Sequence, residues 1–239
     1  MVGKYTCGIF LIIFVVILPW SVAYSQEKDY KTIFGSDWEK AEAFVTENET
    51  WMKQYSVKYD VSYPLAVAVV FPEMIRYSAL RDKIEITLLK TLYINLGEDY
   101  ADFSIGQFQM KPSFAESIHQ KVPLLKSRLR NQFREKVRND DIRKYRSGIV
   151  NDLEQPQSQF LYLIAFLKIC GTIYNLEEMD EDHRLKFLAT AYNYSFQKSF
   201  EEVDKMTDKK FFYTKLVKAE SYYYSDISLF WYKNYHKNK

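Results

Sequence analysis

Residues 65–75 read LAVAVVFPEMI, an apolar stretch that carries a single carboxylate, Glu73. Apolar residues occupy nearly every side of the helix that this stretch predicts, so we expect the helix to be buried. It should begin near Ser62, with Pro64 in its first turn. Pro72 predicts a kink or an end one residue before Glu73, because proline has no backbone N–H. A carboxylate at the end of a buried helix is unusual and requires a structural or functional reason.

Apolar residues recur at helical spacing along most of the chain. A first helix is predicted from Ser36, which forms a capping-box pattern with Glu39, to about Lys58. Further helices are predicted over residues 80–96, 112–130, 156–174 and 180–196. Residues 98–109 are poor in periodicity and predict a loop or a small β-hairpin, and the charged stretch 131–155 predicts a solvated helical face with a loop. The pattern indicates a mainly α-helical single domain.

The first 25 residues have the pattern of a secretory signal. Lys4 provides a positive start, residues 7–20 are almost continuously apolar, and the small residues Ala23 and Ser25 are spaced for signal-peptidase cleavage. The apolar run is short for a membrane span. We therefore expect export and cleavage, with an uncleaved anchor as the alternative, and a mature protein in the periplasm or at the cell envelope.

Composition argues against several functional classes. Lys and Arg number 33 against 31 Asp and Glu, a formal net charge of +2, so no basic stripe for nucleic acid is indicated. Cys170 lies in an apolar stretch and predicts a buried core thiol, without a disulfide partner in the mature chain. His119, His183 and His236 are isolated from one another, so we interpret each as a surface residue and predict no metal site and no cofactor.

Three segments carry residues that suit catalysis. They are VVFPE at 69–73, SIGQFQMKP at 104–112 and AYN at 191–193. Their order and approximate spacing resemble the lytic transglycosylase and goose-type lysozyme superfamily. In that superfamily an apolar helix ends in the catalytic Glu, a Ser-x-Gly-x-x-Gln-x-x-Pro segment follows, and Ala-Tyr-Asn comes much later. The resemblance covers about residues 60–196.

The resemblance implies a lysozyme-like fold that cleaves the MurNAc-β-1,4-GlcNAc bond of peptidoglycan strands, with Glu73 as general acid and base. It also implies a set of substrate-binding residues: Ser104, Gly106, Gln109, Tyr192 and Asn193. In this assignment Gly106 lets backbone and sugar approach closely, the Gln109 amide lines the cleft, and Tyr192 lies near the acid. Met74 stands where the family usually has Ser after the catalytic Glu. We expect these residues to converge on one cleft.

The residues around Glu73 suit an acid catalyst. A glycosidic oxygen is a poor leaving group and needs protonation by a well-placed acid. Neighbours such as Val70, Phe71 and Met74 should desolvate the carboxyl and raise its pKa, as happens to the acid of lysozyme. The alternative is a structural carboxylate that forms an ion pair, for example with Arg76.

Three reactions or roles remain open. A lytic transglycosylase needs one acid, because the muramic 6-hydroxyl attacks the anomeric carbon and yields a 1,6-anhydro product. A lysozyme-type hydrolase uses a second carboxylate, for which Asp99 and Asp102 are candidates, although both also suit a solvated loop. A non-catalytic protein could bind glycan or an envelope partner on the same scaffold. We favour the lytic reaction, and the sequence identifies no protein partner.

The predicted organisation follows these assignments. A helical lead-in over residues 26–60 precedes a lysozyme-like transglycosylase domain over 61–200. Residues 201–239 form an aromatic helical extension that we expect to pack on the domain. Aromatic side chains stack on sugars as readily as they pack in a core, so this extension also suits the binding role.

Overall fold

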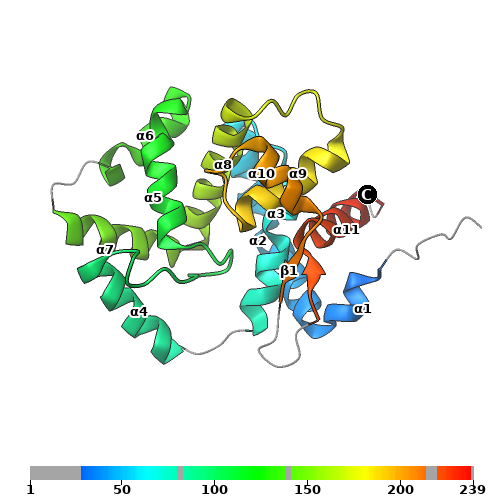
Figure 1. Ribbon diagram of the computed structural model, residues 1–239, viewed down its shortest axis with the longest axis horizontal. Helices are drawn as coiled ribbons and strands as arrows, with labels where there is room; N and C mark the ends of the chain where they lie inside the picture. The colour runs from blue at the N-terminus through cyan, green and yellow to red at the C-terminus, as the bar shows by residue number, and fades with distance from the viewer. Residues whose placement is uncertain (1–27, 80–82, 138–140, 214–219, 238–239) are drawn as a thin grey trace, which may run out of the picture.

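The computed structural model describes residues 28–79, 83–137, 141–213 and 220–237. Within these residues the chain is mainly α-helical, with about 11 helices and one two-stranded hairpin in a single domain (Figure 1). The elements are α1 (Tyr30–Phe34), α2 (Ser36–Tyr59), α3 (Tyr63–Ala79), α4 (Lys83–Leu96), α5 (Pro112–Lys121), the 3₁₀ helix η1 (Val122–Leu124), α6 (Ser127–Val137), α7 (Ile142–Leu153), α8 (Pro156–Ile173), α9 (Glu181–Asn193), α10 (Phe200–Thr207), β1 (Lys210–Phe212), β2 (Tyr222–Tyr223) and α11 (Tyr224–Lys237).

The predicted apolar helix, α3, lies at the centre of one group of helices. Residues 66–71 are fully buried, and α2, α8, α9 and α11 all contact the helix. Phe71 lies between Trp38 of α2 and Trp231 of α11, with ring centres 4.7 and 5.3 Å away. A helix that is apolar on every side requires such complete cover, so the expectation of a buried helix is confirmed.

A second group of helices, α4 to α7, lies on the other side of the molecule (Figure 1). Helix α8 contacts members of both groups, and its side chains from Gln159 to Cys170 are buried apart from Lys168. Cys170 is a free, buried thiol, as predicted. The predicted packing of α3, α8 and α9 in one core is confirmed, since each contacts the other two.

Pro72 was predicted to kink or end the helix, and it does not end α3, which continues to Ala79. Proline removes one backbone donor, but the flanking turns keep their helical bonds because the helix is packed on all sides. The Tyr224 hydroxyl of α11 donates to the carbonyl of Val69 at 3.0 Å in the turn before the proline. Glu73 therefore lies within the helix rather than at its end.

Other helix ends differ from the sequence prediction where a capping residue or the effect of a proline was misjudged. Helix α2 does begin at Ser36, but Gly35 occupies the N-cap position, so the capping box is wrong. The lead-in before it contains the short helix α1, capped by the Asp29 carboxylate. The predicted helix 112–130 divides into α5, η1 and α6, because Pro123 interrupts it. Gly97 ends α4 as expected, with its N–H on the Tyr93 carbonyl at 2.8 Å.

The aromatic C-terminal segment is part of the core. Helix α11 packs against α3 and α9, and its side chains Tyr224, Ile227, Trp231 and Tyr232 are buried. These rings are therefore used for packing rather than displayed to a sugar. The stretch predicted to be a secretory signal, residues 1–25, lies outside the described part of the chain. Among the helices that are described, none is long and apolar enough to cross a bilayer.

His119 on α5 is buried, so its interpretation as a surface residue is wrong. Its Nδ1 lies 2.9 Å from the Tyr145 hydroxyl and its Nε2 lies 2.7 Å from the Tyr162 hydroxyl. Tyr162 also donates to Asp152 at 3.2 Å, and Asp152 forms an ion pair with Lys136. Burial, with a smaller contribution from the Lys136 charge, lowers the pKa of His119 to about 4.

We expect this neutral histidine to weaken the fold in mild acid. In the unfolded chain His119 takes up a proton near its ordinary pKa of 6.5, whereas the folded chain resists protonation down to about 4. Stability that is present above pH 6.5 is therefore lost as the pH falls through this window, by at most about 3 kcal/mol. Urea unfolding of the wild type and of His119→Gln, near neutral pH and near pH 4.5, measures the loss. The variant should lose clearly less stability between the two conditions, and equal losses would contradict the assignment.

Candidate active site

Glu73 is a buried carboxylate that accepts three hydrogen bonds from described residues, and its side chain is 4% exposed. Both of its oxygens accept from Nη1 of Arg76 at 2.9 Å, and Oε1 also accepts from the Asn193 amide at 2.6 Å. Arg76 lies three residues further along α3, a spacing that places both side chains on one helix face. Asn193 is the last residue of α9, 120 positions away. The contact therefore joins the first and third of the segments singled out in the sequence.

Arg76 is held in place by the strand β1 and the residue that follows it. Its Nε donates to the carbonyl of Tyr213 at 3.3 Å. The centre of the guanidinium group lies 4.6 Å from the centre of the Phe212 ring, in a cation–π arrangement. One edge and one face of the guanidinium are thus anchored, while Nη1 contacts the carboxylate of Glu73.

Opposing influences act on the pKa of Glu73. Burial is the largest and raises the pKa above its ordinary value, because a low-dielectric surrounding disfavours the charged form. The Arg76 charge, the Asn193 hydrogen bond and the more distant Lys111 lower the pKa, because each stabilises the carboxylate. The protonation of Glu73 therefore depends on whether Arg76 keeps its contact.

Two buried tyrosines, Tyr192 and Tyr224, lie close enough to Glu73 for its charge to act on them. Burial, and to a smaller extent the negative charge of Glu73, raises the pKa of both hydroxyls. Both hydroxyls therefore stay protonated and serve as hydrogen-bond donors. Tyr192 donates to the carbonyl of Phe108 at 2.8 Å, which links α9 to the second sequence segment.

Residues 105–110 of the second segment form a tight loop. A single antiparallel bridge closes it, with backbone hydrogen bonds of 2.9 and 3.1 Å between Ile105 and Met110. Gly106 and Gln109 both have positive φ, at 68° and 47°. The Gln109 side-chain amide donates to the Gly106 carbonyl at 2.9 Å, so the loop stabilises its own turn.

Gln159 of α8 connects the loop 105–110 to the core. Its amide is fully buried, donates to the Ile105 carbonyl at 2.6 Å and accepts from the Phe108 N–H at 3.0 Å. Two backbone groups that would otherwise be buried without partners are satisfied in this way. The amide packs directly on Gly106, where a Cβ atom would lie only 2.4 Å from Gln159 Nε2. The same Cβ atom would lie 2.6 Å from the Leu153 carbonyl of α7, so only glycine fits without movement of the loop, of the Gln159 side chain or of α7.

The structure brings some of the predicted site residues together and leaves others apart. Glu73 and Asn193 are in contact, and Tyr192 and Gly106 belong to the structure that supports them. The Gln109 amide is turned onto its own loop, and Ser104 is half-buried with no side-chain hydrogen bond among the described residues. The roles of Gln109 and Ser104 in substrate binding therefore stay predictions.

The two candidate second carboxylates have other surroundings. Asp102 accepts from the Lys111 ammonium at 3.1 Å and from the Ser113 N–H, in the first turn of α5, at 3.3 Å. Asp99 is exposed. Asp102 thus has a structural role at the start of α5, and neither residue makes a hydrogen bond to Glu73 in the described part of the chain.

Two residues that build the site have no motif of their own. Gln159 could have been noticed as a polar interruption in an otherwise apolar helix, but its partners are more than 50 positions away in sequence. Tyr224 is one of many tyrosines, and only the packing of α11 on α3 shows that it donates to Val69. Arg76 was considered only as an ion-pair partner, because the anchor at Tyr213 cannot be inferred from sequence spacing.

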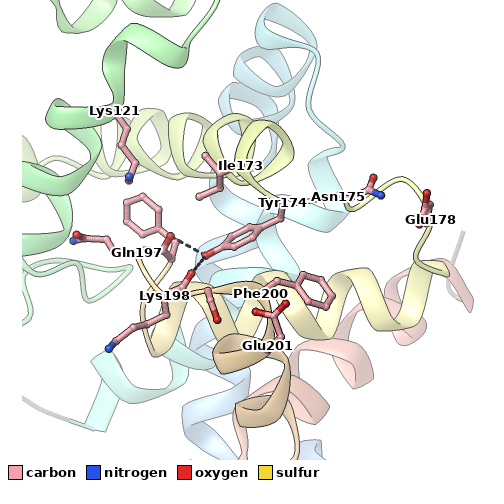
Figure 2. Close-up of a pocket in the computed structure, with 11 residues that line it drawn as sticks. Lys121, Ile173, Tyr174, Asn175, Glu178, Gln197, Lys198, Phe200 and Glu201 are labelled. Atoms are coloured by element: carbon pink, nitrogen blue, oxygen red, sulfur yellow. Dashed lines mark hydrogen bonds between the residues drawn. The ribbon is translucent and has the colours of Figure 1, made fainter.

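A cavity of about 570 Å³ lies at the C-terminal end of α8 (Figure 2). Its lining residues come from α5, α8, α10, the segment between α8 and α9, and the turn after α9. The Tyr174 hydroxyl in it donates to the carbonyls of Phe196 and Lys198 at 2.9 and 2.8 Å, so it stabilises that turn. No predicted site residue lines this cavity, and we do not assign it to the Glu73 site.

Comparison of the chain with models of protein families, with curated proteins and with solved structures finds no match. Among the described residues, no group of three or more His, Cys, Asp or Glu side chains is arranged to hold a metal ion. Inference about function therefore depends on the sequence segments and on the geometry around Glu73.

The close packing of Gly106 on Gln159 leads to a stability prediction. We expect Gly106→Ala to destabilise the protein by at least about 2 kcal/mol, since it adds a side chain at positive φ as well as a steric clash. The matched control is Gly148→Ala in α7, where a Cβ atom would meet nothing within 4 Å. The control should be stabilising by about 0.5–1 kcal/mol, as expected for a helix interior. Urea unfolding measures both changes, and similar effects at the two positions would contradict this packing.

Proposed function

We propose that the chain is an exported lytic transglycosylase with a lysozyme-like fold, and that Glu73 is its general acid and base. The substrate would be the MurNAc-β-1,4-GlcNAc bond of peptidoglycan strands. The observation that carries this proposal is the 2.6 Å hydrogen bond from Asn193 to the buried carboxyl of Glu73. This bond joins the first and third of the segments that resemble the superfamily, and Tyr192, next to Asn193, donates to the loop 105–110 of the second.

The proposed reaction has two proton transfers. Protonated Glu73 donates its proton to the glycosidic oxygen, and the bond between that oxygen and the muramic anomeric carbon breaks. The 6-hydroxyl of the same muramic residue then attacks the anomeric carbon and returns its proton to Glu73. The products are a 1,6-anhydro-muramic end and a free 4-hydroxyl on the departing sugar. Burial of Glu73 supports the first step, because desolvation favours the protonated acid.

The surroundings of the second carboxylates favour the lytic route over hydrolysis. A hydrolase needs a further carboxylate to activate water or to attack the anomeric carbon. Asp102 is already engaged by Lys111 and by the first turn of α5. A single buried acid suits a reaction in which the substrate provides its own nucleophile.

A second function, glycan binding without cleavage, is favoured by one observation. Arg76 donates to both oxygens of Glu73, and such a contact stabilises the carboxylate, which has no proton to give. If this ion pair persisted in the complex with substrate, Glu73 would hold the site together without acting as an acid. Turnover measurements on purified cell wall distinguish the two functions.

Glu73→Gln tests the acid directly. Glutamine keeps the shape and can still accept from Asn193, but it has no acidic proton. We expect cleavage of purified peptidoglycan to fall by about 10²–10⁴-fold, the usual contribution of general acid catalysis. The variant should stay folded and should still bind glycan.

The control for this variant is Glu47→Gln, the same change at an exposed position of α2. It should leave the cleavage rate unaltered. Full activity in Glu73→Gln would exclude Glu73 as the acid, and absence of cleavage by the wild type itself would favour the binding function.

The products distinguish the two chemical routes. Mass spectrometry of the released fragments should show 1,6-anhydro-muramic ends if the reaction is lytic. Asp99→Asn and Asp102→Asn should then retain most activity. Any loss in Asp102→Asn should follow from its weaker hydrogen bonds to Lys111 and to the first turn of α5. Reducing ends, together with an inactive Asp102→Asn protein that is still folded, would instead indicate a lysozyme-type hydrolase.

A further inference from the structure

Arg76 is the more accessible partner of its ion pair with Glu73. The Arg76 side chain is 21% exposed, whereas that of Glu73 is 4% exposed. A ligand in solvent can therefore reach the Arg76 side chain more readily than the Glu73 carboxylate. Guanidinium groups bind carboxylates well, because their N–H donors match the two oxygens of a carboxylate.

The anchoring of Arg76 permits exchange of its carboxylate partner. The contacts to Tyr213 and to the Phe212 ring use Nε and one face of the guanidinium. Neither contact uses the N–H donors of Nη1, the atom that donates to Glu73. Nη1 could therefore pass to another carboxylate while the rest of the side chain keeps its anchors.

The charges near Glu73 suit one added anion. Lys111 is close enough to affect the pKa of Glu73, and its side chain is 53% exposed, paired with Asp102. When Glu73 is neutral, Arg76, Lys111 and Asp102 together carry one positive charge. One carboxylate on the ligand would balance this charge.

Exchange would also change the state of the acid. The Arg76 charge is the strongest of the influences that keep Glu73 ionised, and it opposes the effect of burial. Burial already has the larger effect on the pKa of Glu73, and once Arg76 is paired with another anion this pKa rises further, so that Glu73 takes up a proton from solvent. An ion pair that blocks catalysis in the free protein would thus be released by the substrate itself.

We infer that Arg76 makes the site selective for glycans with a free carboxylate beside the scissile bond, by exchanging Glu73 for that carboxylate. The inference rests on the proposed function, since it assigns a substrate class and a means of regulation to the same site. The lactyl group of a muramic residue without its peptide is one such carboxylate, and a uronic acid is another. Neutral chitin-type glycans would leave the ion pair intact and Glu73 ionised.

Binding measurements with Glu73→Gln test the inference without turnover. The probes are an alternating GlcNAc–MurNAc tetrasaccharide with free lactyl carboxylates and its lactyl amide, which has the same shape and no charge. We expect the free acid to bind at least about tenfold more tightly than the amide, because it gains charge-assisted hydrogen bonds. In Glu73→Gln/Arg76→Gln this preference should disappear, and in Glu73→Gln/Lys168→Gln, where a cation paired with Asp60 is removed instead, it should persist.

Arg76→Gln is combined with Glu73→Gln for a physical reason. Alone it would raise the pKa of Glu73, so binding of either probe would change together with the protonation of that carboxyl. The paired amides remove this titration, so a loss of preference in the double variant reports on recognition by Arg76. A uronic-acid tetrasaccharide serves as a further probe, and its binding shows whether the selectivity extends beyond lactyl groups.

Proton uptake tests the second half of the inference. Calorimetry of the wild type near pH 6, in buffers of different ionisation enthalpy, should show uptake of a proton with a non-cleavable, sulfur-linked form of the free-acid tetrasaccharide. Uptake should be absent with the amide and in Glu73→Gln. Equal affinities for acid and amide, or no proton uptake, would overturn the inference even if the wild type cleaves peptidoglycan. Preserved selectivity and uptake in a protein that cleaves nothing would instead reject the proposed function alone.

Discussion

The burial of one carboxylate within α3 is the constraint on which the rest of the site depends. Glu73 lies among the apolar residues of α3, and an ionised carboxylate there is stable only when good hydrogen-bond donors contact it. The structure provides them from two directions, Arg76 on the same helix and Asn193 at the end of α9. The strand β1 is needed to hold Arg76, and the loop 105–110 is needed to hold Tyr192 beside it.

The same contacts place Glu73 between two chemical states. Burial favours the acid, and the guanidinium favours the carboxylate. If Glu73 were buried without a cation, it would be protonated and could act as a general acid. If its ion pair with Arg76 were fully enclosed, the pair would have only a structural role. Partial exposure of Arg76 makes a third arrangement possible, in which ligand binding determines the state. This balance explains how a lysozyme-like acid and a well-formed ion pair can belong to one proposed function.

The sequence predicted the helices that show a periodic apolar pattern. Its predictions failed where contacts between residues distant in the sequence determine the structure. Helices α3, α8 and α9 were predicted because, within each of these segments, apolar residues recur at the spacing of a helix. Pro72 was expected to kink or end α3, yet the helix continues through it, because packing from α2 and α11 outweighs one missing donor. The contact of Glu73 with Asn193 could be expected only through the resemblance. The hydrogen bonds of Gln159 to the loop 105–110 could not be expected at all. His119 was wrongly predicted to lie at the surface, because nothing in the sequence around it shows that Tyr145 and Tyr162 enclose it in the folded protein.

A direct measurement of the protonation of Glu73 would test this arrangement most simply. Carboxyl ¹³C NMR of the full chain, with the Glu73 resonance assigned by its absence in Glu73→Gln, gives the pKa of this one group. The opposing effects of burial and of Arg76 predict that Glu73 titrates above the exposed glutamates, and that its pKa rises further when Arg76 is replaced by glutamine. A Glu73 that titrates with the exposed glutamates, or whose pKa is the same with and without Arg76, would contradict the arrangement described here.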